Sequence, residues 1–425
     1  MSIQQKFSDI RHGFHPTFWV ANTLELFERF AFYGSKAVLT VYLATKVGLG
    51  VQTAGTLAGL FSGLLYSLPI IAGVFVDRYG FKRTLSACFA FFTIGYFLIG
   101  LAGLEFGQTI VNTVGKTPYV ITVLVLTAIG GSLIKPCIVG TVAKTSTVTM
   151  QSLGYSIYYT LVNIGGAVGP ILALQVREGL GIEYVLIMSS LTSFLLFLGT
   201  LFFYKEPQKN ADEKPRASLS KVFRDMLTVF KNIKFISFLV IFSGFWIMFW
   251  QIFYSFPFYI TEVLKFSRFE ILETVDAWTI IIVSVPVTAL VKRWNPITAM
   301  TLGFLIASTS WVLMAVSPTV TAAIVAMALF AIGEAIQAPR FYEYVASLAP
   351  KDQVGTFMGF AFLPVAIGSF IAGPLSGWLV KTYLQDTMNP TMMWGILSAI
   401  GYGSTMLMFL YNIFFVKKTQ IVYKE

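Results

Sequence analysis

Long apolar stretches follow one another along most of the chain, and short polar stretches separate them. A helix that crosses a bilayer needs about 20 mostly apolar residues. Twelve stretches meet this requirement. The pattern therefore predicts an all-α integral membrane protein with twelve transmembrane helices, at 17–45, 53–77, 83–104, 119–145, 152–176, 183–204, 235–263, 271–291, 296–317, 319–348, 353–381 and 391–416.

The long polar interruption at 205–234 falls at the midpoint of the chain and contains eight basic and four acidic residues. Six runs precede it and six follow it. We expect an N-terminal six-helix bundle at 1–204, a basic linker at 205–234 and a C-terminal six-helix bundle at 235–425. Within the linker, apolar residues recur at helical spacing over 219–230, which predicts an amphipathic helix on the membrane surface.

Composition supports the membrane assignment. The chain is 56% hydrophobic and 12% charged, whereas soluble domains are about 25% charged. The first run lacks a small-residue cleavage site and carries charges, so we expect a retained helix and not a signal peptide. Cys88 and Cys137 lie inside apolar runs, where packing explains them better than a disulfide or a metal site.

The basic residues are distributed unequally between the two sides of this predicted topology. Of the 30 Lys and Arg, twenty lie in the termini and the connections that share their side, and six lie in the opposite connections. The positive-inside rule then places both termini in the cytoplasm. This distribution also accounts for the net charge of +10 without nucleic-acid binding.

The connection after the second run carries a spaced motif, Gly73-Val-Phe-Val-Asp77-Arg78-Tyr-Gly80-Phe-Lys82-Arg83. A generic basic turn would explain the basic residues, but not the spacing of the glycine and the aspartate. The segment resembles the G-x-x-x-D-R-x-G-[RK]-[RK] loop of the major facilitator superfamily. That resemblance implies two six-helix halves with a substrate site near the membrane midplane, and a gating and structural role for the motif.

Four ionisable residues lie within the first run: Glu25, Glu28, Arg29 and Lys36. Charges in the hydrocarbon region are costly and usually functional. At 100° per residue, these side chains fall close to one stripe of a helix. One face of the first helix is therefore expected to look into a bundle or a watery cavity. The alternative is a static ion network that fixes helix packing.

Four segments resemble signatures of one transporter family. Residues 25–34 (ELFERFAFYG) are similar to the E-x-x-E-R-F-x-Y-Y-G motif of the proton-dependent oligopeptide transporters, the peptide transporter family. Residues 130–136 resemble its G-x-x-x-K-P, residues 155–170 its F-S-I-F-Y…I-N-x-G…P, and residues 333–350 its G-E…P…L-A-P. The chain is thus identified as a short, divergent member of this family.

The resemblance implies roles for individual residues. Glu334 would bind the peptide amino terminus, and the proton-coupling group would be Glu25, Glu28 and Arg29. The carboxylate end and backbone of the peptide would meet Lys36, Lys135, Asn163 and Tyr66. Trp246 and Trp250 could line side-chain pockets or simply pack.

The chemistry implied is transport coupled to protons, with no other cofactor. No Walker A sequence, Rossmann glycine loop or His-containing metal cluster occurs in the sequence. We expect a monomer in a bacterial inner membrane that takes di- and tripeptides as substrates.

Three departures from the family pattern leave an alternative open. Phe32 replaces a tyrosine, Lys36 replaces an arginine, and Trp250 stands where the family often has an acidic residue. These changes favour a second hypothesis, an importer or exporter of another zwitterionic or amphiphilic solute, such as a peptide-like natural product, siderophore, drug or lipid. A third hypothesis, a receptor or an intramembrane enzyme, has no nucleophile–base pair in the helices to support it.

Overall fold

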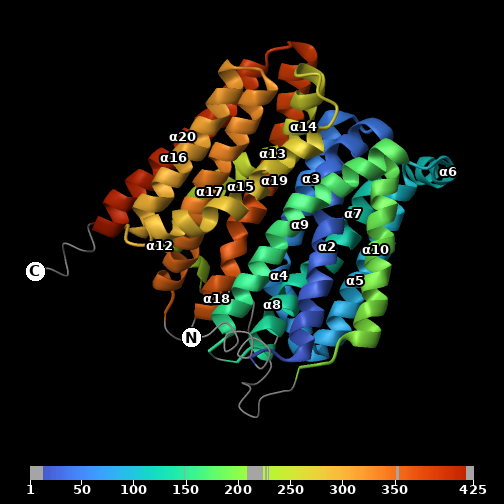
Figure 1. Cartoon of the computed structure of the whole chain (residues 1–425). Helices are drawn as coiled ribbons and strands as arrows, with labels where there is room; N and C mark the ends of the chain where they lie inside the picture. The colour runs from blue at the N-terminus through green and yellow to red at the C-terminus, as the bar shows by residue number, and fades with distance from the viewer. Residues whose placement is uncertain are drawn as a thin grey trace, which may run out of the picture. The chain divides into compact units, whose positions relative to one another are not determined.

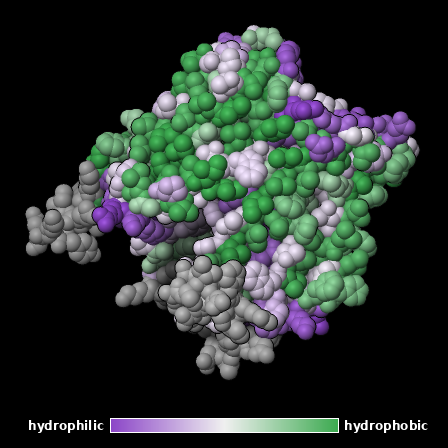
Figure 2. Space-filling model, viewed as in Figure 1, coloured by the Kyte–Doolittle hydropathy of each residue, from purple (hydrophilic) through white to green (hydrophobic). Residues whose placement is uncertain are grey.

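The computed structural model describes residues 13–147, 149–207, 224, 227, 229–350 and 354–417. These residues form helices joined by short connections, with one isolated β-bridge between Phe14 and Ser146 (Figure 1). Apolar side chains cover wide areas of the face seen in Figure 2. Phe202, Ile282 and Val285 are each more than 70% exposed. Such apolar exposure is expected where helices meet lipid.

The chain forms two compact units. Unit 1 contains residues 1–36 and 68–222, and unit 2 contains residues 37–67 and 223–425. The predicted division into two six-helix bundles, with a linker at 205–234, stays a prediction. The two compact units differ from these bundles in one segment: residues 37–67 belong to the unit that contains the second half of the chain.

Glycine contacts explain this grouping. A Cβ atom on Gly59 would lie 2.7 Å from the Cα of Gly373. A Cβ atom on Gly55 would lie 2.7 Å from the carbonyl oxygen of Gly373. Two backbones can approach this closely only where side chains are missing. The hydroxyl of Tyr254 also donates to the Ala58 carbonyl oxygen at 3.0 Å.

The helices of unit 1 follow the predicted runs, with breaks and one addition. The last residues of α2, from Ala37 on, belong to unit 2. The second run is bent by 48° between α3, which belongs to unit 2, and α4, where Pro69 begins a new helix. The fourth run is divided at Leu133, and α6 is a short helix that the pattern did not predict. The bounds are α2 Pro16–Val41, α4 Pro69–Tyr79, α5 Phe81–Leu101, α6 Glu105–Val114, α7 Lys116–Ser132, α8 Ile134–Thr145, α9 Gln151–Gly179 and α10 Ile182–Phe203.

The helices of unit 2 also match the predicted runs. The seventh and eleventh runs each consist of several consecutive helical pieces. The bounds are η1 Tyr42–Lys46, α3 Gly50–Ser67, α12 Ile233–Phe249, α13 Gln251–Tyr254, α14 Phe256–Phe258, η2 Tyr259–Val263, α15 Phe269–Val291, α16 Pro296–Val316, α17 Val320–Leu348, α18 Val354–Gly359, η3 Phe360–Phe362, α19 Leu363–Leu379, η4 Val380–Asp386, α20 Pro390–Tyr411 and η5 Asn412–Lys417.

The twelve predicted spans can be compared with these helices. In the described part of the chain, ten helical segments are long and apolar enough to cross a membrane, and the bent pair of α3 and α4 gives an eleventh. α2 is 26 residues long and corresponds to the first run. It contains four charged residues, Glu25, Glu28, Arg29 and Lys36, and is therefore less apolar than the other eleven. The chain is a multi-pass membrane protein, as predicted.

The predicted amphipathic helix at 219–230 lies mostly outside the described residues. Arg224, Leu227, Val229 and Phe230 are described, and all four are helical.

Glu206 joins the end of α10 to the beginning of α5. Its carboxylate accepts hydrogen bonds from the backbone N–H groups of Phe81 and Lys82, both at 2.7 Å. Gly80 precedes them with a φ of +84°, and a Cβ there would lie 2.8 Å from a carboxylate oxygen of Glu206. A carboxylate is well suited to this position because it accepts from the free N–H groups and complements the helix dipole.

We expect Glu206→Ala to destabilise unit 1 by about 1 kcal/mol, because two N–H groups at the start of α5 lose their acceptor. The midpoint of thermal unfolding in detergent should fall. Arg293→Ala, an exposed change between α15 and α16, serves as the control. Equal midpoints for the two variants would contradict a stabilising role for Glu206.

Candidate functional site

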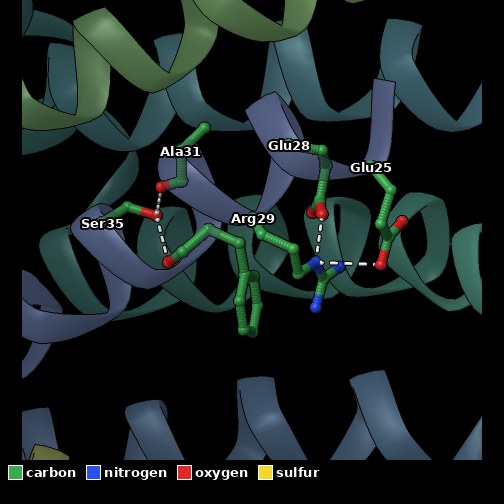
Figure 3. A network of polar contacts seen from close by, with 6 residues as sticks. Glu25, Glu28, Arg29, Ala31 and Ser35 are labelled. Carbon is green, nitrogen blue, oxygen red and sulfur yellow. Dashed lines mark hydrogen bonds and ion pairs between the residues drawn. The ribbon is translucent and has the colours of Figure 1, made fainter. Parts of the chain in front are cut away.

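Three charged side chains of α2 form a buried ionic cluster in unit 1 (Figure 3). The Nε atom of Arg29 donates to Glu28 Oε2 at 2.5 Å and lies 3.3 Å from Glu25 Oε1. The two glutamates are 1% exposed and Arg29 is 3% exposed. The stripe predicted from the sequence is therefore present, and the structure brings these three residues together.

The aromatic residues that follow Arg29 on α2 extend this cluster. The guanidinium carbon of Arg29 lies 4.8 Å from the ring centre of Phe32 and 6.0 Å from that of Tyr33. Cations are attracted to ring faces at such distances. Phe32, one of the departures from the family motif, is therefore a direct neighbour of the buried arginine.

Glycines of α9 allow the cluster to be buried. A Cβ on Gly165 would lie 2.2 Å from the Cβ of Arg29, and one on Gly169 would lie 2.8 Å from the Phe30 carbonyl oxygen. On the α2 side, a Cβ on Gly34 would lie 2.9 Å from the Gly169 carbonyl oxygen. Small residues at such contacts let helix backbones approach closely in membranes. The glycines of the segment 155–170 thus allow α9 to pack closely against α2.

Lys135 belongs to the same electrostatic environment. It lies on α8 just after the break at Leu133, and Arg29, Glu25 and Glu28 are its charged neighbours. Lys36, one turn beyond Phe32 on α2, is 2% exposed. Asn163 lies on α9, where its side-chain amide donates to the Tyr159 carbonyl oxygen at 2.8 Å. Unit 1 therefore gathers the predicted charged residues of both the coupling group and the carboxylate-binding group.

Unit 2 contains a pair of half-buried carboxyl groups, Glu334 on α17 and Asp276 on α15, each with one buried oxygen. Among the described residues, Asp276 is the charged group that acts on Glu334, and no basic side chain does so. The two helices pack through Ile280, Ala331 and Ala335. Ile280 is one turn after Asp276, and the two alanines flank Glu334 along α17, so both carboxyl groups belong to the α15–α17 contact.

The pair has unused hydrogen-bonding capacity. Glu334 Oε2 and Asp276 Oδ1 are buried and have no hydrogen-bond partner within the described part of the chain. The helices packed against α15 and α17 add little charge: α14, α16 and α18 contain no charged residue. On α17 itself, Arg340 is paired with Glu343. Such a pair suits a proton or an ammonium group, because two adjacent carboxylates cannot easily both be ionised.

Sequence reasoning did not assign Asp276 to the site. It belongs to a stripe with Glu270 and Glu273, which recurs every three residues on α15. Two acidic residues within the apolar run 271–291, with Glu270 directly before it, were the signal that could have indicated it.

The aromatic residues predicted in the seventh run, which lie on α12 and directly after it, are mainly core residues. Trp250 is 2% exposed, its indole N–H donates to the Val365 carbonyl oxygen at 3.0 Å, and its ring stacks on Tyr254. Tyr66 contacts the edge of the same ring at 5.7 Å between centroids. Trp246 packs against α19, where a Cβ on Gly368 would lie 2.4 Å from its own Cβ. Packing thus accounts for Trp246 and Trp250, and their contact with substrate stays a prediction.

The motif 73–83 covers the end of α4 and the start of α5. Asp77 and Arg78 are exposed, and Arg78 lies over the ring of Tyr79. The ammonium group of Lys82 donates to the Leu201 carbonyl oxygen at 2.8 Å, which links the motif to α10. Gly73 has open space around its Cα. These contacts lie within unit 1, and the gating and structural role of the motif stays a prediction.

Other candidate chemistry is sparse. Cys88 and Cys137 are buried free thiols. Among the described residues, no group of three His, Cys, Asp or Glu side chains could hold a metal ion.

Many apolar helices with ionic groups buried between them are typical of membrane proteins that move ions or solutes. The sequence profile of the Major Facilitator Superfamily matches residues 23–373 and 268–421. The chain belongs to this superfamily, and it is a transporter rather than an enzyme.

Two kinds of transporter occur among the proteins that the chain is similar to. The chain is 29% identical to the dipeptide and tripeptide permease B of Aliivibrio fischeri over 40% of its own length and 32% of the permease. It is 22% identical to the multidrug resistance protein MdtH of Blochmanniella pennsylvanica over 88% of both chains. The match thus spans about a third of the permease, but nearly all of the multidrug resistance protein.

Solved structures share the fold. A POT family transporter in complex with a thioalcohol-conjugated peptide superposes with a TM-score of 0.76 and 17% identity, over 94% of this chain and 96% of that one. These findings confirm the major facilitator fold. Together with the permease match, they agree with the recognition of the peptide transporter family from its motifs.

Proposed function

We propose that this protein is a proton-coupled symporter that imports di- and tripeptides by alternating access. The observation that carries the proposal is the pair of half-buried carboxyl groups, Glu334 and Asp276, each with one buried oxygen and with no basic neighbour among the described residues. A half-buried negative site of this kind attracts an ammonium group strongly, because the local dielectric constant is low. Every unmodified peptide carries such a group at its amino terminus.

The carboxylate end of the peptide is assigned to Lys36 and Lys135 of unit 1. The peptide backbone is assigned to Asn163 of unit 1 and Tyr66 of unit 2. A lysine binds a carboxylate as a point charge and not as a two-pronged fork. Recognition of the two charged ends would accept many side chains, which fits a transporter of short peptides of varied sequence.

Coupling is assigned to the cluster of Glu25, Glu28 and Arg29. A proton taken up by either glutamate would weaken its ion pair with Arg29. The arginine would then be free to change partners, and Lys135 would lose part of its interaction with the cluster. Because buried ion pairs have discrete arrangements, such an exchange can favour one conformation of the transporter over another. The proton is the coupling ion in this scheme.

A second candidate is a transporter of another zwitterionic or amphiphilic solute, including an exporter of drugs. The near full-length match to a multidrug resistance protein favours it. So do the replacements at Phe32, Lys36 and Trp250.

The cellular setting follows from the charge distribution and the relatives. We place the protein in a bacterial inner membrane with both termini in the cytoplasm, acting as a monomer.

Uptake of labelled dialanine into proteoliposomes tests the proposal. With an inward proton gradient, we expect accumulation that tripeptides compete with and that an uncoupler abolishes. Reconstituted, folded protein that moves no dipeptide under this gradient would rule out the peptide assignment. Drug-stimulated proton flux in the same vesicles would then support the second candidate.

A further inference from the structure

A groove on unit 1 lies between α4, α5 and α7, beside the motif 73–83. Its volume is about 400 Å³. Ala72 and Phe75 line it from α4, Ala87 and Phe91 from α5, and Ile129 from α7. The wall is thus apolar, and the groove is separate from the residues assigned to the peptide and the proton.

One end of the groove is basic. Tyr79 and Arg83 line this end. Two of the three lining hydroxyl groups are already satisfied: Thr84 donates to the Gly80 carbonyl oxygen and Ser132 to the Ile129 carbonyl oxygen, both at 2.7 Å. Arg83 is exposed and pairs with no other described residue. Its guanidinium group, together with the Tyr79 hydroxyl at the same end, is therefore what the groove offers to a polar headgroup.

The length of the groove matches one leaflet. Arg83 and Phe91 are eight positions apart on α5, which corresponds to about 12 Å along a helix. Half of a typical hydrocarbon core is about 15 Å. The basic residues of the motif lie on the side that the charge distribution assigns to the cytoplasm. The groove then runs from the headgroups of the inner leaflet toward the midplane. Phe75 and Ile129 are more than 40% exposed along it.

We propose that this groove binds an anionic phospholipid of the cytoplasmic leaflet. One acyl chain lies along the apolar wall, and the phosphate is held by Arg83, whose planar fork suits a phosphate. Arg78 and Lys82 lie close in sequence and add positive charge, which favours an anionic headgroup over a zwitterionic one. Leu68, at the bend between α3 and α4, also lines the groove. A bound lipid is therefore in contact with the bent span.

Native mass spectrometry of the delipidated full-length protein tests this proposal. The protein is titrated with palmitoyl-oleoyl phosphatidylglycerol or with the matching phosphatidylcholine, and the Kd of the first bound lipid is measured. Two variants probe the groove: Arg83→Gln removes the charge, and Ala87→Trp fills the apolar wall. Two matched controls lie outside it, the exposed Arg293→Gln and the lipid-facing Ile94→Trp on the same helix.

We expect the wild type to prefer phosphatidylglycerol. Arg83→Gln should weaken its binding about fivefold, the effect of one basic residue near an anionic lipid. Ala87→Trp should weaken both lipids, and the two controls should bind like the wild type. Equal affinity for the two lipids, or equal effects of Arg83→Gln and Arg293→Gln, would overturn the proposal. So would a preference for free palmitate over the phospholipid.

Discussion

Glu334→Gln is expected to abolish dipeptide transport. The change keeps the size of the side chain but removes the negative charge that is proposed to hold the peptide amino terminus. Breaking one partner of a buried charge pair costs about 2–5 kcal/mol, so the apparent affinity should fall by at least about thirtyfold. Labelled dialanine uptake into proteoliposomes, driven by a proton gradient, measures the loss.

Asp276→Asn tests whether the carboxyl pair takes part in proton coupling. It imitates a permanently protonated carboxyl group beside Glu334. Because Glu334 is assigned the peptide amino terminus and coupling is assigned to Glu25, Glu28 and Arg29, we expect gradient-driven dipeptide accumulation to continue in this variant. Glu334→Gln should lose accumulation. Glu105→Gln, the same chemical change at an exposed position of α6, should keep it. If Asp276→Asn lost accumulation while exchange of internal for external dipeptide continued, the coupling proton would reside on the carboxyl pair.

The fold was largely predictable because the bilayer imposes its own pattern. Each span must be long and apolar, and this requirement is readable without any knowledge of tertiary contacts. The breaks inside the spans were harder to predict. Pro69 begins α4 after a 48° bend, whereas Pro170 and Pro339 lie inside continuous helices. A proline alone does not decide between these outcomes, since neighbouring helices can satisfy the backbone groups that it leaves free.

The grouping of 37–67 with unit 2 was not predictable from chain order. It depends on glycine contacts between α3 and α19. The sequence does not show which glycine of one helix faces which glycine of the other. The candidate site was also only partly predictable from the sequence. Glu25, Glu28 and Arg29 lie on one helix, so the helical spacing of their positions predicted that they form a cluster. Asp276 and Glu334 are 58 positions apart, and their proximity depends on how α15 packs on α17.

Arg29→Gln is expected to cause the largest loss of stability among the changes considered. It would leave Glu25 and Glu28, both 1% exposed, without the cation to which each is paired. Removing one partner of a buried ion pair typically costs about 3–5 kcal/mol, because the remaining charge stays buried without compensation. Lys135 is a charged neighbour of the cluster, but it lies on another helix. The midpoint of thermal unfolding in detergent should fall clearly below that of Arg293→Gln, an exposed control.

The triple variant Glu25→Gln, Glu28→Gln, Arg29→Gln distinguishes the charge effect from simple loss of packing. Because it removes both negative charges together with the positive one, we expect it to regain most of the stability that Arg29→Gln loses. It should nevertheless fail to couple dipeptide uptake to the proton gradient, since no titratable group of the cluster remains. A triple variant as unstable as Arg29→Gln would mean that the arginine acts mainly by packing against Phe32 and Tyr33. A triple variant that still accumulates dipeptide would place the coupling proton elsewhere, with Asp276 and Glu334 as the remaining candidates.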